Sequence, residues 1–446
     1  MEITRSSQYW LREDQIRDIE AFKEQFTYVP KYKDLKSVPT YTVSYDHGEP
    51  TYYGFPRNLD PGNGNTITDD TTPGDPIEVD FLGEMYEYQE PVLLDFAQKV
   101  LNGGTDLILE ADTGSGKTVM LLKMWTMLKV PALVVVPKSD LIKQWIERIK
   151  KFTGLEDDDI GLARQKVCDW ENKKIVVGMI HSLCKDKYPV EFKQHFGLVV
   201  FDELHKLGAY TFSKVGGMFP AKYRLGATAT LRRADGLAKV FYAHLGTDVI
   251  SPLKGDQPKP KIVVVKYPRS SGKIPHWCRS KVQRRGNLFS MLAANQHRNA
   301  WLSSLVYEVQ LTGRQTLVLS ERIVQLRIIQ DALCRIHGVS PELVGLYIGG
   351  TSDRQKKHIA ENCNVILATT GMLALGTDIP TLRGLVFATP LADAEQAIGR
   401  ICRTCPDTKS PVVIDLVDMN YKDATGWLRG RQKLYGRERW EIVYRS

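Results

Sequence analysis

The chain has 446 residues, 43% hydrophobic and 25% charged, so it is long enough for two or three domains and is not a disordered, collagen-like or small disulfide-stapled protein. The net charge of +8 is unevenly divided: residues 1–80 carry −7 and the remainder carries +15, which favours a polyanionic partner. No apolar run approaches the roughly 20 residues that span a bilayer, and the N-terminus is polar, so we expect neither a membrane span nor a secretory signal. Seven scattered cysteines fit reduced thiols and a cytoplasmic location.

Residues 1–80 are predicted to form a small N-terminal accessory domain. A helix is expected near residues 12–25, and an aromatic-rich β unit across residues 41–55. The tyrosines of that unit could stack nucleic-acid bases or fill a small aromatic core. Residues 58–76 contain few apolar side chains and many Gly, Pro, Asn and Asp, which predicts a linker or an exposed loop.

The rest of the chain alternates short β-branched runs with helical stretches, the pattern of parallel sheets covered by helices on both faces. Two α/β units are predicted, at residues 85–250 and 286–446, joined by a basic linker at residues 251–285. In that linker, residues 254–285 contain ten Lys and Arg against one acidic residue. The expected strands are residues 106–111, 131–137, 174–179, 197–202 and 223–230 in the first unit, and 315–320, 343–348, 364–370, 383–390 and 411–418 in the second.

The strongest local pattern is the glycine-rich run from Glu110 to Thr118, which lies between an expected strand and an expected helix. Its glycines let backbone N–H groups approach the phosphates of ATP. Lys117 can reach the β and γ phosphates, and the Thr118 hydroxyl can ligate Mg²⁺. The alternative is a simple glycine-rich turn before a helix. The predicted nucleotide-binding residues of this loop are Thr113, Gly114, Ser115, Gly116, Lys117 and Thr118.

A second pattern is the apolar strand 197–202, which ends in Asp202 and is followed by Glu203. Ligands bind at the carboxyl ends of strands in parallel sheets of this kind. Asp202 is therefore expected to hold Mg²⁺, and Glu203 to polarise the attacking water as a general base. Taken alone, an Asp-Glu pair after a strand is more often a helix N-cap than a catalytic pair, but a phosphate loop earlier in the chain favours the catalytic interpretation.

Together with residues 226–230 (GATAT), these patterns resemble motifs I, II and III of superfamily 2 helicases, in the same order. Residues 371–380 resemble motif V and residues 396–403 resemble motif VI, so the resemblance covers about residues 85–420. Residues 134–145 and 224–236 resemble the XPB and UvsW branch, and the chain is similar to the compact branch-migration helicases of tailed phages. The resemblance implies two tandem RecA-like domains that bind ATP between them.

The resemblance also implies roles for single residues. Gln89 would read adenine, and Gly376 and Asp378 would sense the nucleotide from the second domain. Coupling residues would be His205, Thr228 and Thr230. The residues implied to grip nucleic acid are Pro137, Lys138, Ser182, Ser320, Arg322, Thr369 and Thr370. They share a position at strand ends, where hydroxyls and amides can bind phosphates, although each one alone could be a cap or turn residue.

The motif VI stretch places Gln396, Arg400 and Arg403 at spacings of i, i+4 and i+7, which predicts one helical face carrying all three. Such a face would supply catalytic arginine fingers to the γ-phosphate. A solvated basic helix face is the alternative. Cys402 and Cys405 form a C-x-x-C pair with no second pair nearby, so no structural zinc is expected.

These patterns predict an ATP- and Mg²⁺-dependent DNA helicase or translocase that acts on single-stranded, forked or branched DNA. Strand separation or branch migration in replication, recombination or repair would be its task, in the cytoplasm of a bacterial host if the gene is carried by a phage. One alternative is a double-strand DNA translocase that does not separate strands. The other is a nucleic-acid-binding module stabilised by its nucleotide.

Overall fold

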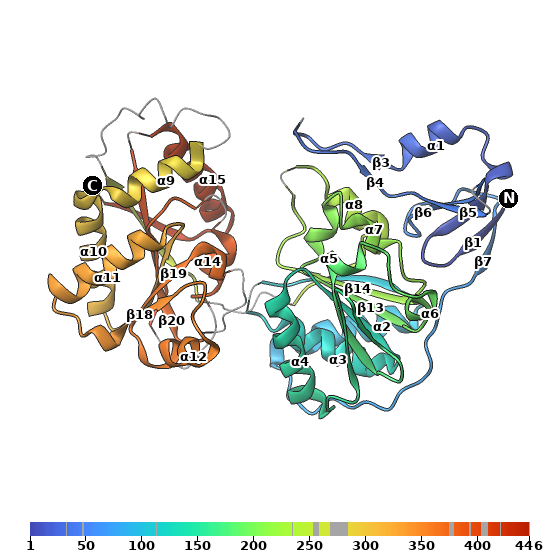
Figure 1. The fold of residues 1–446 in the computed structure, drawn as a ribbon, viewed down its shortest axis with the longest axis horizontal. Coiled ribbons are helices and arrows are strands. Elements are labelled where there is room, and N and C mark those ends of the chain that lie inside the picture. The colour runs from blue at the N-terminus through green and yellow to red at the C-terminus, as the bar shows by residue number, and fades with distance from the viewer. Residues whose placement is uncertain are drawn as a thin grey trace. The chain divides into compact units, whose positions relative to one another are not determined.

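The computed structural model describes the chain except for residues 33, 47–48, 113, 234, 253–257, 268–283, 374–378, 392–393, 403–408, 420 and 446. The described residues divide into two compact units, residues 1–255 and residues 256–446 (Figure 1). Among these described residues, no helix is both long enough and apolar enough to cross a membrane.

The first unit begins with a small five-stranded sheet in the order β5-β6-β2-β1-β7. Its core is aromatic: the ring centroids of Phe22 and Phe26 lie 4.7 Å apart, and those of Phe26 and Phe55 lie 4.9 Å apart. Tyr53 is buried among these rings, whereas Tyr52 is exposed. The elements are β1 (Glu2–Arg5), β2 (Tyr9–Arg12), η1 (Glu13–Gln15), α1 (Ile19–Gln25), β3 (Thr27–Tyr28), β4 (Val38–Pro39), β5 (Thr42–Asp46), β6 (Glu49–Phe55) and β7 (Thr66–Asp69).

Strand β7 lies inside residues 58–76, which the sequence predicts to be a linker or loop. Residues 66–69 pair in parallel with β1, and their side chains are exposed, so no apolar alternation marks the strand. The chain then runs along the first α/β domain, where the Thr72 N–H donates to Pro220 O at 2.7 Å and the Leu82 N–H donates to Phe152 O at 2.8 Å. This stretch is therefore part of the packed unit.

The first α/β domain is built on an eight-stranded sheet in the order β11-β10-β12-β9-β13-β14-β8-β15. All of its strand pairs are parallel except β10 with β11. The elements are η2 (Glu87–Gln89), α2 (Glu90–Leu101), β8 (Asp106–Glu110), α3 (Lys117–Leu128), β9 (Ala132–Val136), α4 (Ser139–Thr153), β10 (Ile160–Arg164), β11 (Val167–Asp169), β12 (Ile175–Met179), α5 (Ile180–Leu183), α6 (Val190–Gln194), β13 (Leu198–Asp202), η3 (Leu204–Gly208), α7 (Ser213–Gly216), β14 (Tyr223–Thr228), α8 (Ala238–Leu245) and β15 (Val249–Ile250).

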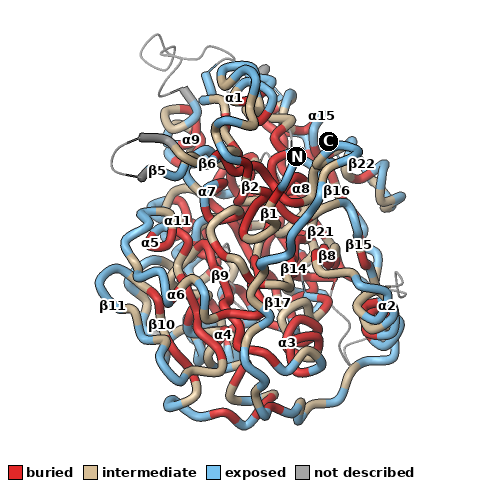
Figure 2. The backbone as a smooth tube through the Cα atoms, turned by 90° about the vertical axis from the view of Figure 1, so that its right-hand side faces the viewer, coloured by how far each residue is buried: buried red, intermediate tan, exposed pale blue. Residues whose placement is uncertain are grey.

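Both faces of this sheet are buried, because successive residues of each strand point to opposite sides. In β8, Leu107 and Leu109 pack with residues of α2, α3 and α4, whereas Ile108 packs with residues of α5 to α8. Strand β9 is buried along its whole length, while β11 at the edge of the sheet is largely exposed (Figure 2). The five strands predicted for this domain are all present.

The second unit is a seven-stranded parallel sheet in the order β18-β19-β17-β20-β21-β16-β22. Its two cores lie on opposite faces of the sheet, so that Leu317 and Leu319 of β17 belong to one and Val318 to the other. The elements are β16 (Lys261–Tyr267), α9 (Arg284–Ala294), α10 (Gln296–Leu311), β17 (Gln315–Ser320), α11 (Ile323–Arg335), η5 (Pro341–Leu343), β18 (Val344–Tyr347), α12 (Asp353–Asn362), β19 (Val365–Thr369), α13 (Thr370–Leu373), β20 (Leu382–Phe387), α14 (Glu395–Gly399), β21 (Val412–Asp418), α15 (Lys422–Arg437) and β22 (Glu441–Arg445).

The fold class predicted from the sequence, α/β with two large parallel sheets, is confirmed. The predicted basic linker at residues 251–285 differs from the structure, because residues 261–267 form β16 between β21 and β22 of the second sheet. The run KIVVVKY is β-branched and suited to a buried strand. Its two lysines contribute to the basic charge of residues 254–285, so charge alone does not distinguish this strand from a linker.

A buried ion pair joins residues 1–80 to the first α/β domain. Arg57 donates from Nε to Asp106 Oδ2 at 3.1 Å and from Nη2 to Asp106 Oδ1 at 2.5 Å, and both side chains are almost fully buried. The same guanidinium donates to the carbonyl oxygen of Ala221 at 2.7 Å. Bidentate pairing and the extra carbonyl acceptors satisfy the charges that burial would otherwise penalise. The small domain is thus attached through its own buried charge.

A second arginine, Arg224, lies beside this pair at the start of β14 and is 1% exposed. It donates to the carbonyl oxygens of Ser7, Phe219 and His244. The His244 ring is 1% exposed and packs against Gly216, where an added Cβ would come within 2.6 Å of the ring. Burial, with a smaller contribution from the positive charge of Arg224, lowers the pKa of His244 to about 3.

Acidification is expected to destabilise the first unit through His244. In the unfolded chain this histidine takes a proton near pH 6.5, whereas in the folded chain it does so only near pH 3, so stability falls as the pH drops through that interval. Between pH 7.5 and pH 5 this linkage removes about 2 kcal/mol from the free energy of unfolding. Urea unfolding at both pH values should show that extra loss in the wild type and not in His244→Leu. Equal losses in the two proteins would contradict the prediction.

Candidate active site

Three strand ends of the first unit meet at the carboxyl edge of its sheet. Strands β13, β14 and β8 are neighbours, with Asp202 in register with Ala227 and Thr228 in register with Glu110. The N–H of Ala111, the first residue after β8, donates to Thr228 O at 3.0 Å. The glycine-rich loop, the acidic pair and the threonine pair are therefore adjacent, although they are far apart in sequence.

The glycine-rich loop has a backbone that only glycine adopts easily at two points. Gly114 has φ +89° and Gly116 has φ +81°, and a Cβ on Gly116 would lie 2.4 Å from Gln89 Nε2. Helix α3 begins at Lys117, so its positive end and Thr118 in its first turn face the loop. Thr113 lies outside the described residues. A loop that ends at a helix N-terminus is suited to binding phosphate.

Two predicted nucleotide-binding side chains contact this loop directly. Lys117 Nζ donates to Ala111 O at 2.8 Å and to Asp112 O at 3.0 Å. Gln89 is 1% exposed and donates from Nε2 to Ser115 O at 2.9 Å. In this structure, Gln89 supports the backbone of the phosphate loop.

The acidic pair lies at the end of β13, of which Asp202 is the last residue. Asp202 accepts a hydrogen bond from Trp145 Nε1 at 2.9 Å and another from the Glu203 N–H at 3.0 Å. Burial, and next the neighbouring charge of Glu203, raise the pKa of Asp202 to about 6, whereas the positive charge of Lys117 opposes the rise. A buried carboxylate in that environment favours a cation. Asp202 and Thr118 supply the oxygen donors that Mg²⁺ prefers, so these residues fit the expected ion.

Glu203 has φ +54° and ψ +53°, the left-handed region that a glutamate rarely occupies. Strain of this kind persists where the surrounding structure holds it, and it is frequent at active sites. Glu203 Oε2 lies 3.3 Å from His205 Nδ1, which lies 3.2 Å from Thr228 Oγ1. Thr228 Oγ1 also accepts from the Thr230 N–H at 3.2 Å. The three predicted coupling residues therefore form one connected group behind Glu203.

The predicted nucleic-acid residues of the first unit lie at the ends of two neighbouring strands, β9 and β12. Pro137 and Lys138 lie between β9 and α4, and Ser182 lies in α5, directly after β12. Ser182 is 8% exposed, and its Oγ accepts from the Gln165 N–H at 2.8 Å. The Ser182 hydroxyl therefore serves the local backbone.

In the second unit, Ser320 and Thr369 are register partners at the ends of β17 and β19, and Thr370 begins α13. Ser320 is fully buried, and its hydroxyl donates to Gln325 Oε1 at 2.7 Å and accepts from the Arg322 N–H at 3.0 Å. It secures the start of α11. The Arg322 guanidinium donates to Gly286 O at 2.7 Å.

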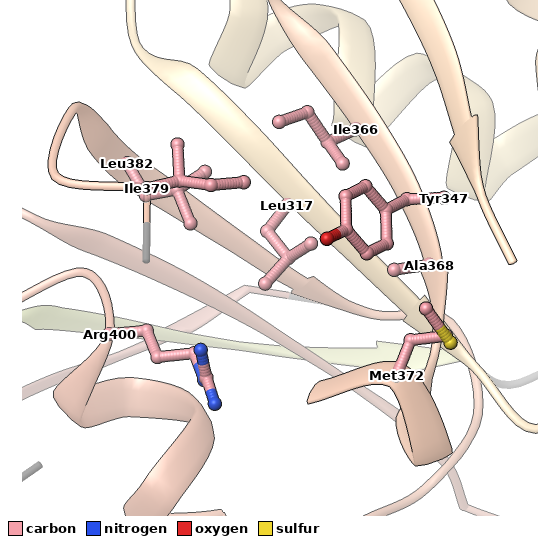
Figure 3. A pocket seen from close by; sticks show the side chains of 8 residues that line it. All are labelled: Leu317, Tyr347, Ile366, Ala368, Met372, Ile379, Leu382 and Arg400. Carbon is pink, nitrogen blue, oxygen red and sulfur yellow. The ribbon is translucent and has the colours of Figure 1, made fainter. Parts of the chain in front are cut away.

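The motif VI residues differ in part from the prediction. Helix α14 ends at Gly399, so Gln396 lies on it while Arg400 follows it in a turn, and no single helix carries the whole set. Arg400 is 8% exposed and lies at one side of an apolar pocket (Figure 3). The other residues lining this pocket are Leu317, Tyr347, Ile366, Ala368, Met372, Ile379 and Leu382. Arg403, Gly376 and Asp378 lie outside the described residues, as does Cys405.

Trp145 is a site residue that the sequence analysis does not predict, although it is the last residue of the stretch 134–145 that resembles the XPB and UvsW branch. It lies on the buried face of α4, is 2% exposed, and donates to Asp202. A buried indole needs an acceptor for its single N–H. A tryptophan in the helix that follows a strand of a nucleotide-binding sheet is a sequence signal for such a contact.

Several known proteins are similar to this chain. Residues 82–233 match the family described as the type III restriction enzyme res subunit. A protein of Acanthamoeba polyphaga mimivirus, named as an ATP-dependent RNA helicase, is 28% identical over 428 residues, covering 93% of this chain and 79% of its own length. The DNA 3'-5' translocase XPB2 of Sulfurisphaera tokodaii is 37% identical over 139 residues, which are 31% of this chain and 30% of its own length.

Among solved structures, the Hef helicase domain of Pyrococcus furiosus is similar with a TM-score of 0.50 and 17% identity, covering 77% of this chain and 98% of that domain. This likeness bears on the fold alone, which is that of tandem RecA-like helicase domains. The helicase relatives and the restriction-subunit match bear on the chemistry. The chain is an ATP-hydrolysing enzyme, and the relatives it resembles are named helicases and translocases.

Proposed function

We propose that the chain is a DNA-stimulated motor that couples ATP hydrolysis to strand separation or branch migration. The observation that carries this proposal is the meeting of the phosphate loop, the Asp202–Glu203 pair and Thr228 at one sheet edge. In such an arrangement, hydrolysis at the end of one strand can shift the groups at the ends of the neighbouring strands. ATP is the fuel, and the work takes place in the cytoplasm.

In this proposal, Lys117 leaves the carbonyl oxygens of Ala111 and Asp112 and binds the β and γ phosphates. Glu203 accepts a proton from the attacking water, and Asp202 with Thr118 holds Mg²⁺. The ion, when bound, neutralises charge on the phosphates. To read adenine, Gln89 would have to release the carbonyl oxygen of Ser115, to which its Nε2 donates in this structure.

The second unit is proposed to complete the site. Arg400 and Arg403, with Gln396, would stabilise charge on the transferred phosphoryl group, and Gly376 and Asp378 would report the nucleotide to that unit. An arginine that lines a pocket in its own unit must turn outward to do so. Hydrolysis would then require the two units to approach, which links the nucleotide state to a change of grip on DNA.

We propose DNA as the track, in single-stranded, forked or branched form. The basic balance of +15 outside residues 1–80 favours a polyanion, and the Sulfurisphaera tokodaii relative is named a DNA translocase, although the mimivirus relative is named an RNA helicase. Of the proposed gripping residues, Lys138, Arg322, Thr369 and Thr370 suit phosphate contacts best. Pro137, Ser182 and Ser320 would act through the backbone at their strand ends.

DNA-stimulated turnover tests this function. ATP hydrolysis should rise strongly with DNA and fall steeply as salt is added, because neutralising phosphates releases counterions. The measurement compares single-stranded DNA, plain duplex, forked DNA, a four-way junction and single-stranded RNA at several salt concentrations. Hydrolysis that ignores every nucleic acid and all salt would contradict a nucleic-acid motor. If RNA stimulates hydrolysis and DNA does not, the nucleic acid along which the motor moves is RNA.

A double-strand DNA translocase that does not separate strands is the second candidate, favoured by the match to the type III restriction subunit. The same substrates, carrying fluorophores on opposite strands, distinguish the two. A helicase separates the forked duplex or moves the junction as it hydrolyses ATP. A translocase hydrolyses ATP on plain duplex, displaces a protein block, and leaves the strands paired.

A further inference from the structure

A hairpin from residues 1–80 contacts the segment that follows the threonine pair. We name residues 27–39 the N-terminal arm; they include β3 and β4, which pair with each other, and residue 33 is not described. We name residues 231–237 the bridge segment, of which residue 234 is not described. The bridge segment begins directly after Thr230 and ends at α8.

Within the bridge segment, Arg233 and Asp235 form a half-buried bidentate ion pair. Arg233 Nε donates to Asp235 Oδ1 at 3.0 Å and Nη2 donates to Asp235 Oδ2 at 2.5 Å, and the side chains are 17% and 14% exposed. The third donor group, Nη1, donates to the carbonyl oxygen of His205. The guanidinium also lies over Gly208, where an added Cβ would come within 2.7 Å of Arg233 Nε. Arg233 is therefore fixed against the turn that carries the acidic motif.

The N-terminal arm holds the other side of the same pair. The Lys31 N–H donates to Asp235 O at 2.9 Å, and the Lys31 side chain lies against Gly236, which has φ +78°. Val38 of the arm is fully buried against Leu237 and Val240. The arm thus fixes the backbone on which the Arg233–Asp235 pair is built.

The turn that Arg233 contacts also sets the conformation of Glu203. The Lys206 N–H donates to Glu203 O at 2.8 Å, so residues 203–206 close one tight turn around the left-handed Glu203. His205 presents its carbonyl oxygen to Arg233 and its ring to Glu203 Oε2. A left-handed glutamate needs outside support, because the relaxed backbone would move its carboxylate. The bond from Arg233 supplies such support from outside the acidic motif.

We propose that Arg233 is a positioning residue for Glu203, and that the N-terminal arm is a structural part of the hydrolysis site. The inference rests on the proposed role of Glu203 as the general base. Arg233 touches neither nucleotide nor water in this account. It holds the turn of residues 203–206, and the arm holds Arg233 through Asp235. Contacts made by residues 1–80 therefore reach the turn of the general base through a chain of hydrogen bonds, from Lys31 to Asp235, from Asp235 to Arg233, and from Arg233 to the carbonyl oxygen of His205.

The test compares full-length Arg233→Gln, Arg233→Lys and Val38→Ala with the neighbouring exposed arginine changed, Arg232→Gln, as the matched control. Arg233→Gln should lower kcat for ATP by about 10- to 100-fold, because a small displacement of a catalytic group is that costly. Its ATP dissociation constant should stay close to that of the wild type, since residues 111–118 are untouched. Arg233→Lys keeps the charge opposite Asp235 and should recover part of kcat. Val38→Ala should lower kcat less, and Arg232→Gln should leave basal turnover unchanged.

Combination with Glu203→Gln separates positioning from general damage. If Arg233 acts through the Glu203 carboxylate, Arg233→Gln adds no further loss to the residual turnover of Glu203→Gln. A double variant much slower than Glu203→Gln alone overturns the inference, as does an Arg233→Gln protein with wild-type kcat. A Glu203→Gln protein with wild-type turnover overturns the proposed function as well. Slow Glu203→Gln with normal Arg233→Gln overturns this inference alone.

Discussion

Replacement of Lys117 by alanine is expected to lower ATP turnover by about two to three orders of magnitude, the usual cost of removing a preorganised charge from a transferring group. The lysine belongs to the first turn of α3, and its Nζ reaches the carbonyl oxygens of Ala111 and Asp112. Steady-state hydrolysis with saturating DNA is the measurement. Lys166→Ala, an exposed lysine on the turn between β10 and β11, is the control and should hydrolyse ATP normally.

Glu203→Gln is the companion to this change. It removes the proton acceptor while keeping nearly the same shape, so nucleotide should still bind and turnover should fall by about two to four orders of magnitude, to a residual rate. Binding of a fluorescent ATP analogue and hydrolysis should therefore separate in this variant. Wild-type hydrolysis by either Lys117→Ala or Glu203→Gln would contradict the assignment of the active site.

Arg403→Ala is expected to have the largest effect on turnover, about 10³- to 10⁵-fold, which is the range that arginine fingers supply in phosphoryl transfer. Residues 111–118 make most of the contacts to the nucleotide in this proposal, so its affinity should change little. Hydrolysis and nucleotide binding are measured on the full chain. Arg335→Ala is the matched control in the same unit, since that side chain is 80% exposed and pairs with Asp331 on the surface.

A fragment of residues 1–255 tests whether hydrolysis needs the second unit. If arginines of residues 256–446 complete the ATP site, the fragment should bind ATP weakly and fail to hydrolyse it even when DNA is present. Hydrolysis by the fragment at the rate of the intact chain would show that Arg400 and Arg403 have another task. The fragment keeps residues 1–80, because the buried Arg57–Asp106 pair crosses from them into the α/β domain.

Local pattern was enough to predict most of the strands and the conformation of the glycine-rich loop. The run 132–136 is apolar and β-branched throughout, which in this setting means a strand buried on both faces, and it is β9. The phosphate loop needs two glycines in a left-handed backbone before a helix, and Gly114 and Gly116 have that conformation. Such features depend on a few consecutive residues, so a single sequence carries them.

Features that depend on distant partners could not be predicted. The residues around Asp106 do not indicate that its partner is Arg57, because the pair forms only when the small domain packs against the α/β domain. Ser320 follows a strand, as a phosphate-binding serine would, but Gln325 is placed to take its hydroxyl. The seven-residue spacing from Gln396 to Arg403 suggested one helical face, yet α14 ends at Gly399. Tertiary packing decides the Arg57–Asp106 pair, whereas the Ser320–Gln325 contact and the end of α14 are local outcomes that residue type and spacing alone do not settle.

The Arg57–Asp106 pair limits how relatives of this enzyme can be recombined. A chimera that joins the small domain of one protein to the motor of another leaves a buried carboxylate facing the wrong side chain, unless residues 57 and 106 travel together with Arg224. An uncompensated buried charge costs about 3–5 kcal/mol, which is a large part of the free energy that keeps a domain folded. Residues 1–255 should therefore be exchanged between proteins as one unit. Insertions and exchanges are tolerated at its surface loops sooner than at the border between its two parts.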